Sequence, residues 1–186
     1  MIKIFNIASS KIRTSPFTYY KCLQCKAFGS NLKCPPYSQI WRDTNDIVKK
    51  YKFFTIICST HPLREDEISL TFNKFGNINR AIAILVRKYS VVAKWEAHKK
   101  MLEVHKKIAG EKVAFSSGRC LYCVKKGCNK QHCIKPDISY VSLESAGIDM
   151  VRTLEDSPEP LEISFNFVLK KRVNAYAGIL HNDYAL

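Results

Sequence analysis

The stretch FFTIIC, Phe53 to Cys58, decides the fold class of this chain. It combines aromatic and β-branched residues in one apolar run, which predicts a buried strand that ends near His61 and Pro62. A first strand is predicted upstream over Ile2 to Ala8, and a second buried strand downstream over Lys112 to Ser116. The chain is therefore organised around a sheet whose strands are far apart in sequence.

Helices are predicted between these strands. Asp43 is a suitable N-cap for a short helix that runs to about Lys50. Residues 62–76 are polar and predict a loop. Apolar residues then recur at three- and four-residue steps from Asn79 to Ala109, which predicts one long amphipathic helix with Gly110 as its C-cap.

The C-terminal third completes the predicted fold. Ser142 is expected to cap a helix over Leu143 to Leu154, weakened at Gly147. Apolar and polar residues alternate over most of 161–169, which predicts an edge strand. Residues 172–181 are expected to pair with it, so the C-terminal strands cover 161–181. We expect a single domain over 1–186, of the α/β or α+β class, with a mixed sheet, flanking helices and cysteine-rich metal-binding loops at strand ends.

Composition excludes several classes of protein. With 186 residues, 46% of them hydrophobic, the chain has enough apolar side chains for a core, which excludes global disorder. No apolar run approaches the roughly 20 residues of a membrane span, and the N-terminus lacks a signal-peptide pattern. We therefore expect a cytoplasmic protein without a membrane partner. The net charge of +14 implies an anionic partner or a highly solvated surface.

Eight cysteines are the main indication of function. A reducing cytoplasm disfavours disulfides, so clustered cysteines there indicate metal or redox chemistry. Seven of the eight fall in two tight groups, in the segments 20–38 and 118–136. The predicted metal ligands are Cys22, Cys25 and Cys34 in the first group and Cys120, Cys123, Cys128 and Cys133 in the second. Cys58 lies in the apolar strand and is interpreted as a buried core residue.

The spacings favour an iron–sulfur cluster over zinc. Prolines follow both groups closely, at Cys34-Pro35-Pro36 and at Pro136 after Cys133, and a proline next to a ligand is frequent in iron–sulfur proteins. The second group lacks the two paired cysteines of a zinc ribbon. We expect one or two clusters, of the 4Fe–4S type, with zinc as the alternative.

Three ordered motifs resemble a known family. They are the early Cys-x-x-Cys with Cys-Pro-Pro, the later Gly-x-Cys-x-x-Cys cluster, and the segment Ser142-Leu-Glu-Ser-Ala-Gly-Ile-Asp149. Together they resemble the uncharacterised microbial family described as predicted metal-binding proteins, over about residues 20–155. The resemblance implies metal binding and an enzyme-like layout, and it implies no particular reaction.

Glu144 is the candidate catalytic residue. In the structural interpretation, its negative charge stabilises the first turn of a helix through the helix dipole. In the functional interpretation, the carboxylate lies near the metal and acts as acid, base or oxygen ligand. If the four cysteines of the second group bind one cluster, only the three cysteines of the first group remain to bind a second cluster. One iron of that second cluster then has an open coordination position.

Two functional hypotheses from different classes follow. The first is an iron–sulfur protein that serves redox or sulfur-related chemistry with a redox partner protein. The alternative is a non-catalytic, zinc-stabilised module that binds nucleic acid or a nucleoprotein through its basic surface. Lys125, Lys126, Lys130 and Lys135 interleave with the second cysteine group, where they balance a negative cluster or bind RNA or another anionic partner weakly. Whether the protein is an enzyme is left open by the sequence.

Overall fold

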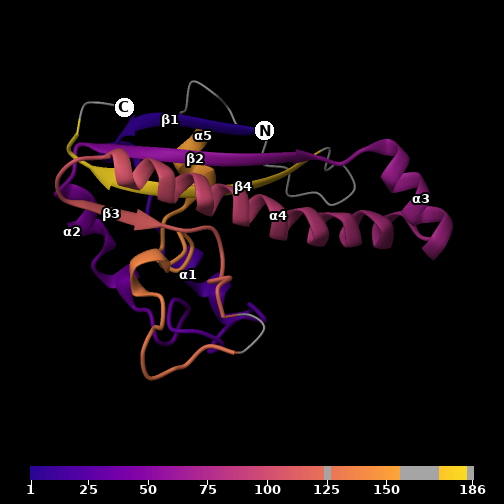
Figure 1. Ribbon diagram of the computed structural model, residues 1–186, viewed down its shortest axis with the longest axis horizontal. Helices are drawn as coiled ribbons and strands as arrows, with labels where there is room; N and C mark the ends of the chain where they lie inside the picture. Colours follow the sequence, from indigo (N-terminus) through magenta and orange to yellow (C-terminus); the bar gives the residue numbers. More distant parts are fainter. Residues whose placement is uncertain (124–126, 156–171, 184–186) are drawn as a thin grey trace.

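A four-stranded antiparallel sheet forms the centre of the molecule (Figure 1), as described by a computed structural model over residues 1–123, 127–155 and 172–183. The strands are β1 (Ile2–Ala8), β2 (Phe53–Pro62), β3 (Lys112–Phe115) and β4 (Arg172–His181), in the order β1-β2-β4-β3. All three strand pairs are antiparallel. The α+β class is therefore confirmed, with an antiparallel sheet in place of the expected mixed one.

β2 and β4 are the inner strands, and their alternating side chains build a core on each face of the sheet. Phe54 and Ile56 point to one face, where they pack with Leu180, whereas Ile57 points to the other, where it packs with Ala177. Side chains on successive strand residues face opposite ways, so one apolar run such as FFTIIC can supply both cores.

The helix α4 (Ile78–Lys107) covers the second face of the sheet. It packs through Ala93, Ala97, Met101 and Val104, all buried. Asn77 caps its N-terminus by accepting a hydrogen bond from the Arg80 amide at 3.0 Å. The long helix predicted over 79–109 is therefore confirmed to within two residues at each end. Figure 1 shows that its N-terminal end, next to α3, extends beyond the sheet.

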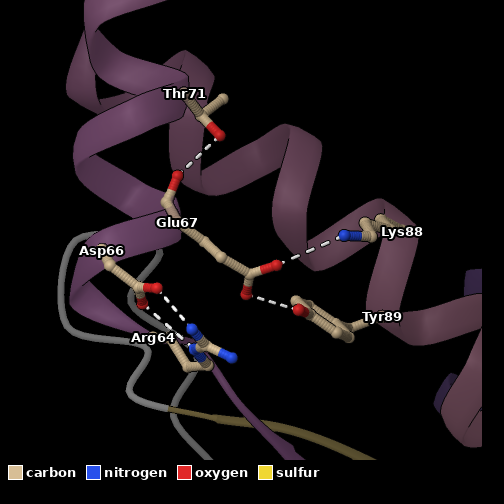
Figure 2. Close-up of polar contacts among 6 residues, drawn as sticks. All are labelled: Arg64, Asp66, Glu67, Thr71, Lys88 and Tyr89. Carbon is tan, nitrogen blue, oxygen red and sulfur yellow. Dashed lines mark hydrogen bonds and ion pairs between the residues drawn. The ribbon is translucent and has the colours of Figure 1, made fainter.

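Residues predicted as a loop form the helix α3 (Glu65–Phe75), so the prediction for 62–76 is wrong. Three acidic residues in its first turn favour a helix N-terminus, and Gly76 ends it with a positive φ of 65°. Figure 2 shows how it is held against α4: the Glu67 carboxylate bonds the Tyr89 hydroxyl and, at 3.3 Å, the Lys88 ammonium. These contacts are tertiary and have no counterpart in local sequence.

The remaining elements are α1 (Pro16–Leu23), α2 (Thr44–Lys49), α5 (Met150–Glu155) and the 3-10 turns η1 (Ser9–Lys11), η2 (Ile40–Arg42) and η3 (Pro136–Ile138). Of these elements, α2, η2 and α5 contribute to the core on the first face of the sheet, and Figure 1 shows α1 and α2 below the strands. The helix α1 was not predicted, although Ser15 caps it and Pro16 occupies its first position. None of the helices in the described ranges combines the length and apolar character that a membrane span requires.

The helix predicted over Leu143 to Leu154 is mostly wrong. Ser142 does accept a hydrogen bond from the Ser145 amide, at 3.0 Å, as a capping residue would. The chain then turns at Gly147, whose φ of 74° is left-handed, and the helix α5 begins only at Met150. Of the C-terminal strands, residues 161–169 lie outside the described residues, and 172–181 form the inner strand β4.

The close packing of Phe54 on Gly178 can be tested by substitution. A side chain at 178 would overlap the Phe54 ring, because glycine alone leaves room for it. We expect Gly178→Ala to lower the free energy of unfolding by about 1–3 kcal/mol in urea titrations. In a Phe54→Leu background the same substitution should cost less, and equal costs in both backgrounds would contradict this packing.

Candidate metal centre

The first cysteine group is formed where α1 ends. Cys22 lies in the last turn of the helix, and the Cys25 amide donates to its carbonyl oxygen at 3.1 Å, which turns the chain back. Two donors reach the sulfurs: the Ala27 amide lies 3.4 Å from Cys25 Sγ, and the Asn31 side-chain amide lies 3.3 Å from Cys34 Sγ. Such donors stabilise a thiolate and tune the potential of a metal bound to it.

The second cysteine group follows β3. Gly118 and Gly127 adopt positive φ values of 62° and 78°, which allow the chain to turn around the group. All four of its thiols are half-buried. Burial, strengthened by the three neighbouring thiols, raises the pKa of Cys123, so these cysteines lie close enough to interact electrostatically.

Cys120 connects the two groups. Burial raises the pKa of the Cys34 thiol; the Asn31 hydrogen bond opposes this effect, and the nearby Cys25 and Cys120 add to it. Because Cys120 also interacts with Cys123, the two groups form one neighbourhood of seven thiols, although they are about one hundred residues apart in sequence.

A cavity of about 580 Å³ opens beside the first group, and we call it the thiol cavity. Five cations and a single carboxylate line it, so its walls carry an excess of positive charge. The lining includes Cys22, Cys25 and Cys34 with Lys21, Lys26, Arg87, Lys94, Arg119 and Glu144. A thiolate–metal centre is negatively charged, so the soft donors and the surrounding cations fit such a group.

Glu144 lies at the thiol cavity but not in a helix. It belongs to the turn between Ser142 and Gly147, so the predicted dipole interaction in a first helical turn is wrong. The structure instead brings its carboxylate near Cys22. Burial, then Glu144 and the other two thiols of the group, raise the pKa of Cys22 to about 11. The thiol is therefore neutral at pH 7, and a metal must displace its proton on binding.

His98 supports the second group, a role that the sequence did not reveal. It is buried on α4, with Nδ1 at 2.9 Å from Ser116 Oγ and Nε2 at 2.9 Å from Tyr122 Oη. Burial lowers the pKa of His98, so the ring is neutral and offers one donor and one acceptor. Tyr122 lies between Cys120 and Cys123, so this contact fixes the second group to α4.

The thiols share a neighbourhood without forming a closed ligand set. Among residues 1–123, 127–155 and 172–183, no three His, Cys, Asp or Glu side chains are arranged as a metal-ion site. The seven cysteines remain predicted ligands, and Cys58 is fully buried in β2, as expected of a core residue.

A family model for predicted metal-binding proteins, DUF2284, matches residues 6–181, which is nearly the whole chain. The chain belongs to this family. The resemblance found in the sequence motifs is thereby confirmed, and membership supports a metal cofactor in general. No curated protein and no solved structure matches the chain.

The second group gives a direct test of metal binding. We expect Cys120→Ser to lose bound metal and to unfold at a lower temperature, because a metal that binds only the folded chain stabilises it. Cys58→Ala is the matched control: it should lower the melting temperature through a small cavity while the metal content stays at the wild-type level. Wild-type metal content in Cys120→Ser would contradict the assignment.

Proposed function

We propose that this protein is a cytoplasmic iron–sulfur protein that serves redox or sulfur-related chemistry. The observation that carries the proposal is the thiol cavity, where three thiols lie among five cations and beside the second cysteine group. Hydrogen bonds from Ala27 and Asn31 to two of the sulfurs also suit a cluster, whose potential depends on such donors.

Charge and spacing support different parts of the proposal. The cations compensate any thiolate–metal centre, because four thiolates give either a 4Fe–4S cluster or a zinc ion a charge of about −2. Iron–sulfur is favoured by the ligand spacing and by the prolines after Cys34 and Cys133. When bound, a 4Fe–4S cluster would supply electron transfer and, at an iron lacking a protein ligand, Lewis acidity.

The count of thiols supports an open position. Seven clustered cysteines supply four ligands to one centre and three to another, and Cys120 lies where it could complete either group. With Cys120 bound in the second group, the open position lies in the first, and Glu144, which also lines the thiol cavity, is then the side chain available to hold a proton there or to fill that position.

The zinc-stabilised, nucleic-acid-binding module is the alternative. The lysines expected to serve it are only partly described, since Lys125 and Lys126 lie outside the described residues. Lys130 and Lys135 lie over the rings of Tyr37 and Tyr122, with ammonium-to-centroid distances of 6.0 and 5.8 Å. These contacts hold both cations next to the cysteine segments and favour a charge-balancing role. Weak, salt-sensitive RNA binding would support the alternative.

Anaerobic purification distinguishes the two functions. We expect a brown protein with broad visible absorbance from thiolate-to-iron charge transfer, containing iron and acid-labile sulfide in equal amounts. Both should fall in Cys34→Ser, and the Cys58→Ala variant should keep them. A colourless protein that contains zinc in stoichiometric amounts would overturn the iron–sulfur proposal in favour of the alternative.

The open position is tested with cyanide on the reduced protein. We expect cyanide to change the paramagnetic resonance spectrum, and Glu144→Gln to respond at several-fold lower cyanide, because the substitution removes a competing carboxylate. Glu111→Gln is the control, since Glu111 bonds Tyr51 at 3.2 Å and does not line the thiol cavity. If cyanide changes the spectrum of neither the wild type, Glu144→Gln nor Glu111→Gln, an iron with an open coordination position is excluded.

A further inference from the structure

A second cavity adjoins the thiol cavity, and we call it the apolar cavity. Its volume is about 770 Å³, and Lys94 and Arg119 line both cavities. The rest of its wall is mostly apolar and comes from α4 and the second cysteine segment. Besides the two shared cations, its lining includes Val91, Val92, Trp95, Leu121 and Ile134.

Several apolar side chains of this wall are open to solvent. Val91 is 55% exposed and Ile134 is 59% exposed, although both line the same cavity. Exposed apolar side chains that converge on a cavity indicate a ligand with an apolar surface. The cavity is also within the range of about 300–1,000 Å³ that is typical of small-molecule sites.

The two shared cations lie where the two cavities meet. A side chain at Gly118 would come within 2.9 Å of the Lys94 ammonium nitrogen, so glycine at this position leaves room for the cation. Arg119 follows directly in sequence and lies close enough to Cys34 to influence that thiol. Both cations therefore face the boundary between a charged compartment and an apolar one.

We propose that Lys94 and Arg119 bind the anionic head of an amphipathic small molecule whose apolar body occupies the apolar cavity. The head carries carboxylate or phosphate oxygens, which ammonium and guanidinium groups both recognise. A simple inorganic anion would leave the apolar wall uncovered. The five cations of the thiol cavity exceed the combined charge of Glu144 and a metal centre of about −2, so an uncharged apolar molecule would leave positive charge unbalanced. An amphipathic anion satisfies both surfaces at once.

The inference deepens the proposed function by naming the substrate class of the metal centre. It rests on that function only in assigning the bound molecule as a substrate, since its head would lie at the edge of the thiol cavity. Binding itself depends on the two cations and the apolar wall.

Calorimetric titration of the protein as purified, with its metal, tests the proposal. The probes are octanoate and octyl phosphate, below their micellar concentrations, with 1-octanol and inorganic phosphate as molecules that carry only one of the two parts. We expect at least one amphipathic anion to bind about tenfold or more tightly than either partial probe. Comparison of octanoate with octyl phosphate identifies the preferred head.

Variants separate the two parts of the site. Lys94→Gln should weaken binding of the preferred anion about tenfold and leave octanol unchanged, whereas Val91→Asp, at an exposed position, should weaken both. Lys88→Gln is the matched control: it removes a cation six residues earlier on α4 that pairs with Glu67, and binding should not change.

Equal affinities for octanoate, octyl phosphate and octanol would overturn the proposal, as would equal losses in Lys94→Gln and Lys88→Gln. Protein that carries its iron–sulfur cluster and binds neither amphipathic anion would refute this inference alone. Zinc-containing protein whose anion binding depends on Lys94 would refute the iron–sulfur proposal and leave this inference standing.

Discussion

The packing of α4 across β2 and β4 is the interaction on which the rest of the structure depends. Ala93, Ala97 and Ala177 are completely or almost completely buried, and their small side chains allow the helix to lie close to the sheet. That contact fixes the rotation of α4 about its axis. Arg87, Lys94 and His98 are spaced by seven and four residues, so they follow one side of the helix toward the cysteine segments.

The same helix thus supplies charge and support to the cysteine neighbourhood. Arg87 and Lys94 line the thiol cavity, and His98 bonds the tyrosine between two cysteines of the second group. Without metal, burial keeps the Cys22 and Cys34 thiols neutral, so the cavity presents mostly positive charge. Thiolates formed on metal binding would meet cations already in place, which lowers the cost of burying their charge.

The sequence predicted the elements that local pattern determines. FFTIIC, the first strand and the long amphipathic helix have strong periodicity or composition, and all three are present close to their predicted bounds. The helix α3 was missed although Ile68, Phe72 and Phe75 recur at helical spacing and Gly76 ends it, because its many polar residues were interpreted as a loop. The Glu67 contacts that hold it against α4 are tertiary. The helix expected after Ser142 fails because Gly147 takes a left-handed conformation, which a capping pattern does not reveal.

The candidate site also has a part that the sequence predicts and a part that it does not. Seven clustered cysteines are evident from spacing alone, because ligands of one centre often lie close in sequence. The proximity of Cys34 to Cys120, the cations of α4 and the support from His98 depend on tertiary packing, so no local pattern could reveal them.

Native mass spectrometry of the anaerobically purified protein tests most directly whether these thiols bind iron–sulfur clusters. We expect the mass of the folded protein to exceed the 21.3 kDa mass of the chain by one or two Fe4S4 units. A folded protein whose added mass corresponds to zinc, or whose mass equals that of the bare chain, would contradict iron–sulfur binding.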